Sequence, residues 1–299
     1  MSAVTLNPPA TAPERKDRKP KLSGKHLTIR VLQYLALALY LIFLGFPLLW
    51  LISASMKSSG ELNSLTANLI PQDFHFSNFS EALQKQGLVR SAGNSIFVAI
   101  ATTILVIVVS LPGAYALARF KGKIRAAGTG WILVSQVFPV ILIIIPLFLI
   151  LKQVGLVDNL WGLILVYTTY TMPFALWMLQ GYVQSIPVDL EEAGAMDGAS
   201  RLKVLMGIVF PLLKPGIIAT AMFSFVSAWN EFFFALVLIQ SPENYTLPIT
   251  LKMFVGGEGK VALGPLAAGA VLATIPSIIF FALLQRKLAS GLMAGAVKG

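Results

Sequence analysis

The chain alternates long apolar runs with short segments that collect charged residues, proline and glycine. A helix that crosses the hydrocarbon core of a bilayer needs about 20 mostly apolar residues, and six runs meet this requirement. The pattern predicts an all-α integral membrane protein with six transmembrane helices, at Val31–Ser55, Ser95–Leu117, Gly130–Leu151, Leu160–Leu179, Pro215–Ile239 and Gly264–Leu284.

The composition agrees with a membrane protein and excludes several other classes. Of the 299 residues, 56% are hydrophobic and 12% are charged, whereas soluble domains carry about 25% charged residues. The chain has no cysteine, which excludes disulfides and thiolate chemistry. It has no histidine in an apolar run and no His-Glu-x-x-His motif, so nothing indicates a membrane enzyme, a catalytic residue or a metal site.

The net charge of +10 is explained by topology and gives no reason to expect nucleic-acid binding. Most of the 23 Lys and Arg residues lie in 1–30, in the loop after Ala118, in 186–214 and after residue 285. Basic residues gather in the cytoplasmic segments of membrane proteins. Both termini are therefore expected in the cytoplasm, with a basic disordered tail at 1–30, a six-span domain at 31–285 and a second tail at 286–299.

The charged segment 186–214 lies between the fourth and fifth predicted spans. Pro187 and the acids that follow it suit the first turn of a helix, Gly198 suits its end, and Ser200 suits the cap of a second short helix. Spacing alone leaves two interpretations open. The segment is either an interfacial hairpin that joins two spans or a rigid module that docks on a soluble partner.

The same segment resembles the signature cytoplasmic loop of permease subunits of bacterial ATP-binding-cassette (ABC) importers. Further stretches, such as "FSFVSAWNEFFFALVL" and the terminal "LASGLMAGAVKG", resemble the carbohydrate-importing branch and its shorter permease, as in maltose-transporter-like systems. Two positions depart from the loop pattern, with glycine in place of its second alanine and phenylalanine in place of its leucine. The matching and departing positions are Glu192, Ala193, Gly194, Gly198, Ile208, Phe210 and Pro211.

The resemblance implies a type I ABC importer permease with a coupling helix that docks on an ATPase. The chain would then work with a second, longer permease, two ATPase subunits and an extracytoplasmic sugar-binding protein. The resemblance also implies that the C-terminal tail, Ala296, Val297, Lys298 and Gly299, contacts the ATPases, unless this tail is only a frayed end. The docking residues would be Glu191, Glu192, Ala193, Gly194, Asp197, Gly198, Ala199, Ile208 and Pro211.

We expect no cofactor in this chain, with ATP and Mg²⁺ bound by the partner ATPase. Gly259 and Lys260 are followed by Val261 rather than by Ser or Thr, so this segment does not form a phosphate-binding loop. The expected function is import of a di- or oligosaccharide across a bacterial inner membrane. Hydropathy alone leaves an ATP-independent carrier or a channel for small polar solutes as the alternative.

Three residues are candidates for the translocation path. Asn230 and Glu231 lie within the fifth span, where a carboxyl group is costly and faces a cavity or a partner helix. They either line the path or form packing hydrogen bonds to the partner permease. Tyr170 could stack on a sugar ring or belong to the packing. The polar loop 240–260 either reaches a sugar-binding protein, as the resemblance implies, or only connects two spans.

Overall fold

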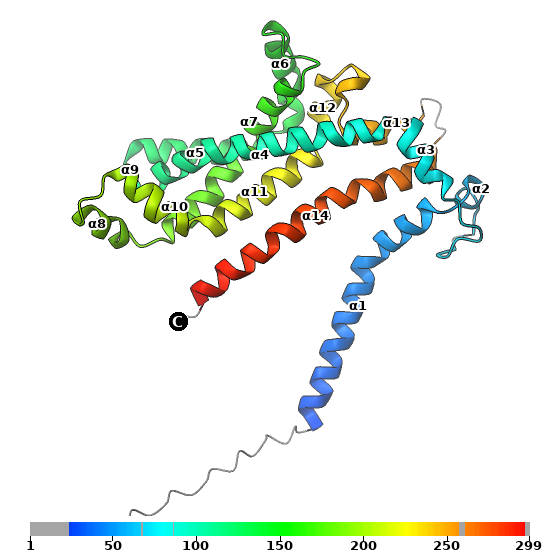
Figure 1. The fold of residues 1–299 in the computed structure, drawn as a ribbon, viewed down its shortest axis with the longest axis horizontal. Helices are drawn as coiled ribbons and strands as arrows, with labels where there is room; N and C mark the ends of the chain where they lie inside the picture. The colour runs from blue at the N-terminus through cyan, green and yellow to red at the C-terminus, as the bar shows by residue number, and fades with distance from the viewer. Residues whose placement is uncertain (1–23, 67, 86, 257–260, 297–299) are drawn as a thin grey trace, which may run out of the picture. The chain divides into compact units, whose positions relative to one another are not determined.

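The structure is a computed structural model that describes residues 24–296, apart from 67, 86 and 257–260. Over these residues the chain is helical, and the only strand-like pairing is an isolated bridge between Val255 and Val261. The chain divides into two units, Met1–Leu49 and Trp50–Gly299. Within the second unit, Figure 1 shows α4, α7 and α11 side by side.

The helices follow one another without a sheet. They are α1 Gly24–Ser55, α2 Ser59–Leu62, α3 Ser77–Lys85, α4 Leu88–Arg119, α5 Lys123–Val137, α6 Val140–Gln153, α7 Leu160–Gln184, α8 Asp189–Met196, α9 Arg201–Val204, the π-helical turn η1 Leu205–Val209, α10 Phe210–Leu212, α11 Lys214–Trp229, α12 Phe233–Leu238, the 3₁₀ turn η2 Pro242–Asn244, α13 Leu247–Met253 and α14 Leu263–Ala296.

Four of the six predicted spans lie in unbroken helices, and the other two are bent or interrupted. Among the described residues, four helices are long and apolar enough to cross a membrane, and two bent helix pairs would raise the number to six. The four unbroken helices are α1, α4, α7 and α14. The fold therefore agrees with the all-α membrane class, with four to six candidate spans.

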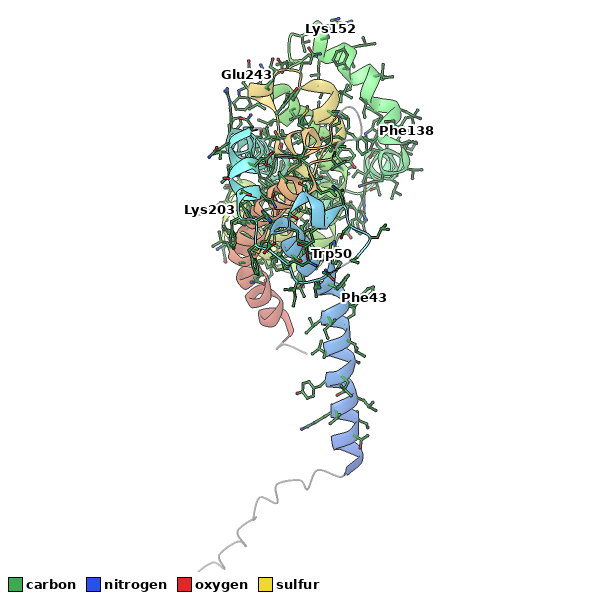
Figure 2. The ribbon with its side chains drawn as sticks, turned by 90° about the vertical axis from the view of Figure 1, so that its right-hand side faces the viewer. Phe43, Trp50, Phe138, Lys152, Lys203 and Glu243 are labelled. Atoms are coloured by element: carbon green, nitrogen blue, oxygen red, sulfur yellow. The ribbon has the colours of Figure 1, made fainter. Side chains whose placement is uncertain are left out.

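The third predicted span, Gly130–Leu151, is divided between α5 and α6, which meet at an angle of 103°. Pro139 lies at the break and has no backbone N–H to donate, so the helix cannot continue through it with normal hydrogen bonding. Figure 2 labels Phe138 beside this bend. In contrast, Pro112 and Pro173 lie inside continuous helices, where neighbouring helices can compensate for the lost hydrogen bond.

The fifth predicted span, Pro215–Ile239, is also not one helix. α11 ends at Trp229 and α12 begins at Phe233, so three residues separate the two helical parts. At its other end, α11 meets the preceding helical segment Arg201–Leu212 at 70°. Pro215 lies in the first turn of α11, where a proline is tolerated because that N–H has no helical partner.

The second unit is built around α4, which packs most extensively against α7 and then against α11. One apolar cluster lies between these helices and includes Tyr167, Phe225, Trp229 and Phe234. A second cluster joins α4 and α7 to the segment α9–α10 through residues such as Val183, Val204 and Val209. The first cluster packs the helices around the break between α11 and α12, and the second packs the segment α9–α10 against α4 and α7.

Both predicted terminal tails include helical residues. α1 already begins at Gly24, within the predicted disordered stretch 1–30, and α14 continues as helix to Ala296, within the predicted tail 286–299. Residues 24–30 are therefore helical and not disordered, whereas the cytoplasmic position of both tails stays a prediction. Residues 1–23 and the last three predicted contact residues, Val297, Lys298 and Gly299, lie outside the described part of the chain.

Candidate functional site

The segment between α7 and α11 folds as the predicted two-helix module. Three acids lie in the first turn of α8, where they complement the positive end of the helix dipole. Gly198 then turns the chain with a φ of 81°, a left-handed backbone that glycine adopts without a Cβ clash. The Ser200 side chain accepts a hydrogen bond from the Lys203 N–H, 3.4 Å away, and caps α9. The positions predicted for the turn and the cap are confirmed.

Gly194 explains one departure from the sequence pattern. It is buried in α8, and a Cβ placed on it would lie 2.6 Å from Ile208 Cδ1 and 3.3 Å from Val204 Cγ2. The helix therefore approaches the α9–η1 segment more closely than an alanine permits without rearrangement. The structure thus shows that this glycine makes room for close packing.

The opposite side of the module is exposed. Glu192 and Ala193 are exposed on α8, Met196 at its end is 89% exposed, and Asp197, which follows the helix, is also exposed. Leu202 on α9 is also exposed. The predicted docking residues differ in exposure. Five are exposed, namely Glu192, Ala193, Asp197, Gly198 and Pro211. Three are partly buried, Glu191, Ala199 and Ile208, and Gly194 is buried. The module therefore combines a packed inner side with an exposed outer side that mixes acidic and apolar groups.

Glu191 points toward α4 and not toward the exposed side. Its Oε2 accepts a hydrogen bond from the Tyr115 hydroxyl at 2.7 Å, and its Oε1 accepts one from Arg119 Nε at 2.7 Å. Arg119 Nη2 lies 2.7 Å from the same Oε1 and donates to the Ile186 carbonyl at 2.9 Å. Sequence reasoning missed Tyr115 and Arg119, because more than 70 residues separate them from Glu191 and no local pattern joins them.

A cavity of about 450 Å³ lies beside this cluster. Its lining includes Tyr115, Arg119, Glu191, Glu192, Arg201 and Leu202. The inner surface of the module therefore has charges of both signs close to the end of α4.

The break between α11 and α12 contains the two predicted polar path residues. Glu231 accepts hydrogen bonds from the backbone N–H groups of Phe234 at 2.9 Å and Ala235 at 3.2 Å, so its carboxylate caps α12. Asn230 is exposed and donates to the Val226 carbonyl at 2.8 Å. Sequence reasoning found both residues and did not foresee that Glu231 is a helix cap.

Tyr170 lies near the same break. Its ring meets that of Phe234 edge to face, with 5.6 Å between the centroids. It is half exposed and lines a cavity of about 330 Å³ together with Trp131, Ile143 and Phe234. The structure thus brings Tyr170 close to the capped start of α12, while Asn230 points elsewhere, to the preceding turn of α11.

The polar loop after α12 is folded against its surroundings. Asn94 Nδ2 donates to the carbonyls of Glu243 and Tyr245, each at 2.9 Å, and Ser95 Oγ accepts from the Leu247 N–H at 2.8 Å. The Ser91 and Thr250 hydroxyls lie 2.5 Å apart. The start of α4 therefore holds this loop. Figure 2 shows Glu243 and Lys152 at the same end of the second unit.

Asp158 fixes the loop from a second direction. Its carboxylate accepts hydrogen bonds from the backbone N–H groups of Gln240 at 3.0 Å and Ser241 at 2.9 Å, and from the Ser241 hydroxyl. Burial opposes ionisation of this carboxyl, but the hydrogen bonds from Ser241, Gln240 and Asn244 outweigh it and lower the pKa of Asp158 to about 2. Sequence reasoning missed this residue, since its partners lie more than 80 positions away.

No cluster of His, Cys, Asp and Glu that could hold a metal ion occurs among the residues that the structure describes. The candidate sites among the described residues are therefore the exposed module and the cavities, and not a metal centre. The absence of a cofactor remains a prediction.

Comparison with known proteins gives the family. The profile of the family described as "Binding-protein-dependent transport system inner membrane component" matches residues 110–293. The diacetylchitobiose uptake permease DasC of Streptomyces coelicolor is 34% identical over 260 residues, which cover 86% of this chain and 94% of DasC. The trehalose transport permease SugB of Mycobacterium tuberculosis is 36% identical over 256 residues, 85% of this chain and 92% of SugB.

A solved structure agrees with the sequence relatives. A chain of a bacterial ABC transporter involved in the import of the acidic polysaccharide alginate superposes with a TM-score of 0.73 and 26% identity, over 90% of this chain and 99% of the other. The helical order, the bent spans and the two-helix module thus occur in a chain that shares its fold with an importer subunit. The chain belongs to the family of inner membrane components of binding-protein-dependent transport systems and is a multi-pass membrane permease of the ABC type.

Proposed function

We propose that this chain is the permease subunit of an ATP-driven importer that moves a di- or oligosaccharide delivered by an extracytoplasmic binding protein. The single observation that carries the proposal is the module Glu191–Pro211. It lies between two candidate spans, turns at a left-handed Gly198, and exposes Glu192, Ala193 and Met196. A rigid helix on such an exposed module can enter a groove on a soluble ATPase.

The module is placed to transmit movement into the membrane domain. α7 leads into it and α11 leaves it at a bend of 70°, and its inner side belongs to the apolar cluster that includes Leu179, Val183 and Leu213. Closure of the ATPases would move the module and the packed helices together, as alternating access requires. ATP and Mg²⁺ belong to the ATPase subunits in this proposal.

The substrate class is inferred from the relatives. One relative takes its name from diacetylchitobiose and another from trehalose, and the structural relative serves alginate import. All three compounds are carbohydrates of two or more units. A di- or oligosaccharide therefore fits this chain better than a monosaccharide or an ion.

The proposal includes the membrane orientation and the other partners. Both termini and the module face the cytoplasm, because the basic residues gather there, and the membrane is the bacterial inner membrane. A second, longer permease, two ATPases and a sugar-binding protein complete the complex. The loop 240–260 faces the binding protein, and the C-terminal residues 296–299 reach the ATPases.

The translocation path passes the break between α11 and α12. Tyr170 lines the cavity there and presents a half-exposed ring on which a sugar can stack. Asn230 is exposed and offers an amide to sugar hydroxyls, while the Glu231 carboxylate is already engaged by two backbone N–H groups. Tyr170 and Asn230 are therefore the path residues that can contact sugar, and Glu231 keeps the break in place.

Uptake into proteoliposomes tests this function. The complete complex is reconstituted with its binding protein, and entry of labelled trehalose, diacetylchitobiose and an alginate oligosaccharide is measured with and without ATP. The proposal expects ATP-dependent uptake of at least one of them that also requires the binding protein. Uptake that proceeds equally without ATP would contradict it and favour a carrier or channel.

A further inference from the structure

Two neighbouring glutamates on α8 face in different directions. Glu192 is exposed, whereas the Glu191 side chain is only 12% exposed and lies against the end of α4. A residue that docks on a partner needs a free side chain. The Glu191 carboxylate already has three contacts inside the chain, with Tyr115, with Arg119 Nε and with Arg119 Nη2.

These contacts connect three elements. Tyr115 and Arg119 belong to the last turns of α4, Glu191 to the first turn of α8, and the Ile186 carbonyl that accepts from Arg119 follows the end of α7. We propose that Tyr115 and Arg119 clamp Glu191, so that α8 moves together with α4, and that Glu191 is a positioning residue of the module and not a contact for the ATPase. This inference rests on the proposed function.

The geometry makes the clamp stiffer than a surface ion pair. Exposed pairs gain little because water screens them and both side chains lose freedom. Here both side chains are mostly buried, at 14% and 12% exposure. Each oxygen of the carboxylate has its own donor, and the guanidinium is fixed a second time by the Ile186 carbonyl. Charge-assisted hydrogen bonds with several fixed partners hold one geometry.

Apolar packing supports the clamp from beneath. Leu111 and Ala114 of α4 and Ile186 are buried in the same cluster as Val204 and Val209 of the module. This cluster attaches α9 and η1 to α4 and α7, and the clamp attaches α8 to the end of α4, so both parts of the module are held on the same helix.

α4 carries this attachment to the opposite end of the fold. The hydrogen bonds of Asn94 and Ser95 to the loop after α12 lie near the start of the same continuous helix. At 1.5 Å per residue, Ser95 and Arg119 are about 36 Å apart along the helix axis. One helix thus holds the polar outer loop at one end and the coupling module at the other, which links the two proposed docking surfaces.

A double-mutant cycle on the complete complex in lipid nanodiscs tests the clamp. Arg119→Ala, Glu191→Ala and the double variant are compared for ATPase co-purification, basal ATP hydrolysis and stimulation by binding protein with sugar. We expect the ATPase to stay bound and basal hydrolysis to remain, while stimulation falls about tenfold, since charged hydrogen bonds are worth that much or more. The double variant should lose less than the sum of the two single losses, because the contact between Arg119 and Glu191 is removed in all three.

Two further variants separate positioning from general stability. The exchange of both charges, Arg119→Glu with Glu191→Arg, should restore part of the stimulation. Tyr115→Phe removes only the hydroxyl and should give a smaller loss in a complex that still folds, which keeps the test decisive if the alanine variants do not assemble. Asp189→Asn is the matched control, since Asp189 is an exposed acid in the same helical turn.

The outcomes distinguish this inference from the proposed function. If the wild-type complex shows no stimulation by any sugar-loaded binding protein, the proposed function fails. If the wild type is stimulated and the clamp variants equal it, only the clamp is refuted. Loss of the ATPase on purification of Glu191→Ala, with Arg119→Ala unaffected, would show that Glu191 is a docking residue and would overturn the inference.

Discussion

Asp158 shows how one side chain can organise a loop. It is the only non-glycine residue with positive φ in the described chain, at 56°, a backbone that costs free energy unless the surroundings enforce it. Its carboxylate binds the segment after α12, and its backbone N–H donates to the carbonyl of Leu238, the last residue of α12, at 2.8 Å. These hydrogen bonds stabilise a backbone conformation of Asp158 that would otherwise be unfavourable.

Replacing Asp158 with Asn should loosen this loop in a pH-dependent way. The carboxyl has its pKa lowered from 3.8 to about 2 in the folded chain, so its ionised form stabilises the fold above about pH 3.8 and this contribution is lost as the pH falls through 2. Because the group is partly exposed, we expect at most about 1 kcal/mol. Thermal unfolding in nanodiscs should show a wild-type advantage at pH 6 that shrinks toward pH 2.5. A constant difference would contradict this account.

Glu231 makes a second prediction at the residue scale. Its carboxylate caps α12, so Glu231→Ala should lower the free energy of unfolding by about 1 kcal/mol, the usual cost of a lost helix cap. Glu231→Gln retains an acceptor oxygen and should lose less. Asn230→Ala serves as the comparison, because Asn230 is exposed and its side chain donates to the end of α11 and not to α12. Thermal unfolding measures all three, and an equal effect of Asn230→Ala and Glu231→Ala would argue against capping.

The packing of α8 depends on the size of residue 194. Gly194→Ala should change stability little, because the helix gains about 1 kcal/mol in propensity and the nearest atom is the mobile end of Ile208. Gly194→Leu should destabilise by about 1–3 kcal/mol, the usual cost of overpacking, and should weaken ATPase co-purification. Ala195→Leu, at an exposed position of α8 that lines the cavity beside Glu191, is the matched control. Equal stability of both leucine variants would refute the close packing.

Helix positions could be predicted from the sequence better than helix breaks. Apolar length placed the four unbroken candidate spans, and local residue types placed the turn at Gly198 and the cap at Ser200. Proline alone did not identify the break, since Pro139 ends a helix while Pro112 and Pro173 do not. The outcome depends on whether neighbouring helices restore the lost hydrogen bonds, which is a tertiary property.

The candidate sites divide in the same way. Glu192 and Gly198 could be found because the loop pattern is local in sequence. Arg119, Tyr115 and Asp158 could not, because each meets a partner on a distant element through ordinary residue types. Glu191 and Glu192 were both predicted as docking residues, since a helix seen without its neighbours does not show which acid faces inward, and the structure places Glu191 against α4.

At the scale of the whole molecule, the orientation in the membrane follows from charge and can be tested directly. The chain has no cysteine, so single cysteines report sidedness without background. Lys203→Cys should react with a membrane-impermeant maleimide only from the cytoplasmic side, and Glu243→Cys only from the outside. Both positions are exposed, and Figure 2 labels both. Reaction of both from the same side would contradict the proposed topology.

The organisation of the second unit explains how two distant surfaces can work together. α4, α7 and α11 share apolar clusters, and the module and the outer loop are both attached to α4. Packed helices of this kind move as bodies between discrete arrangements. The family assignment supports a transporter built in this way. An ATP-independent carrier was an alternative on hydropathy alone, and the family assignment argues against it.

The most direct test of the central claim is ATP hydrolysis by the purified complex in lipid, stimulated by sugar-loaded binding protein, for wild type and Glu192→Lys side by side. Glu192 is exposed on α8, so reversing its charge should leave the fold intact and disturb only docking. The account predicts strong stimulation of the wild type, and a variant that loses this stimulation or sheds its ATPase. A variant that keeps its ATPase and is stimulated like the wild type would contradict the claim that this module is the coupling joint.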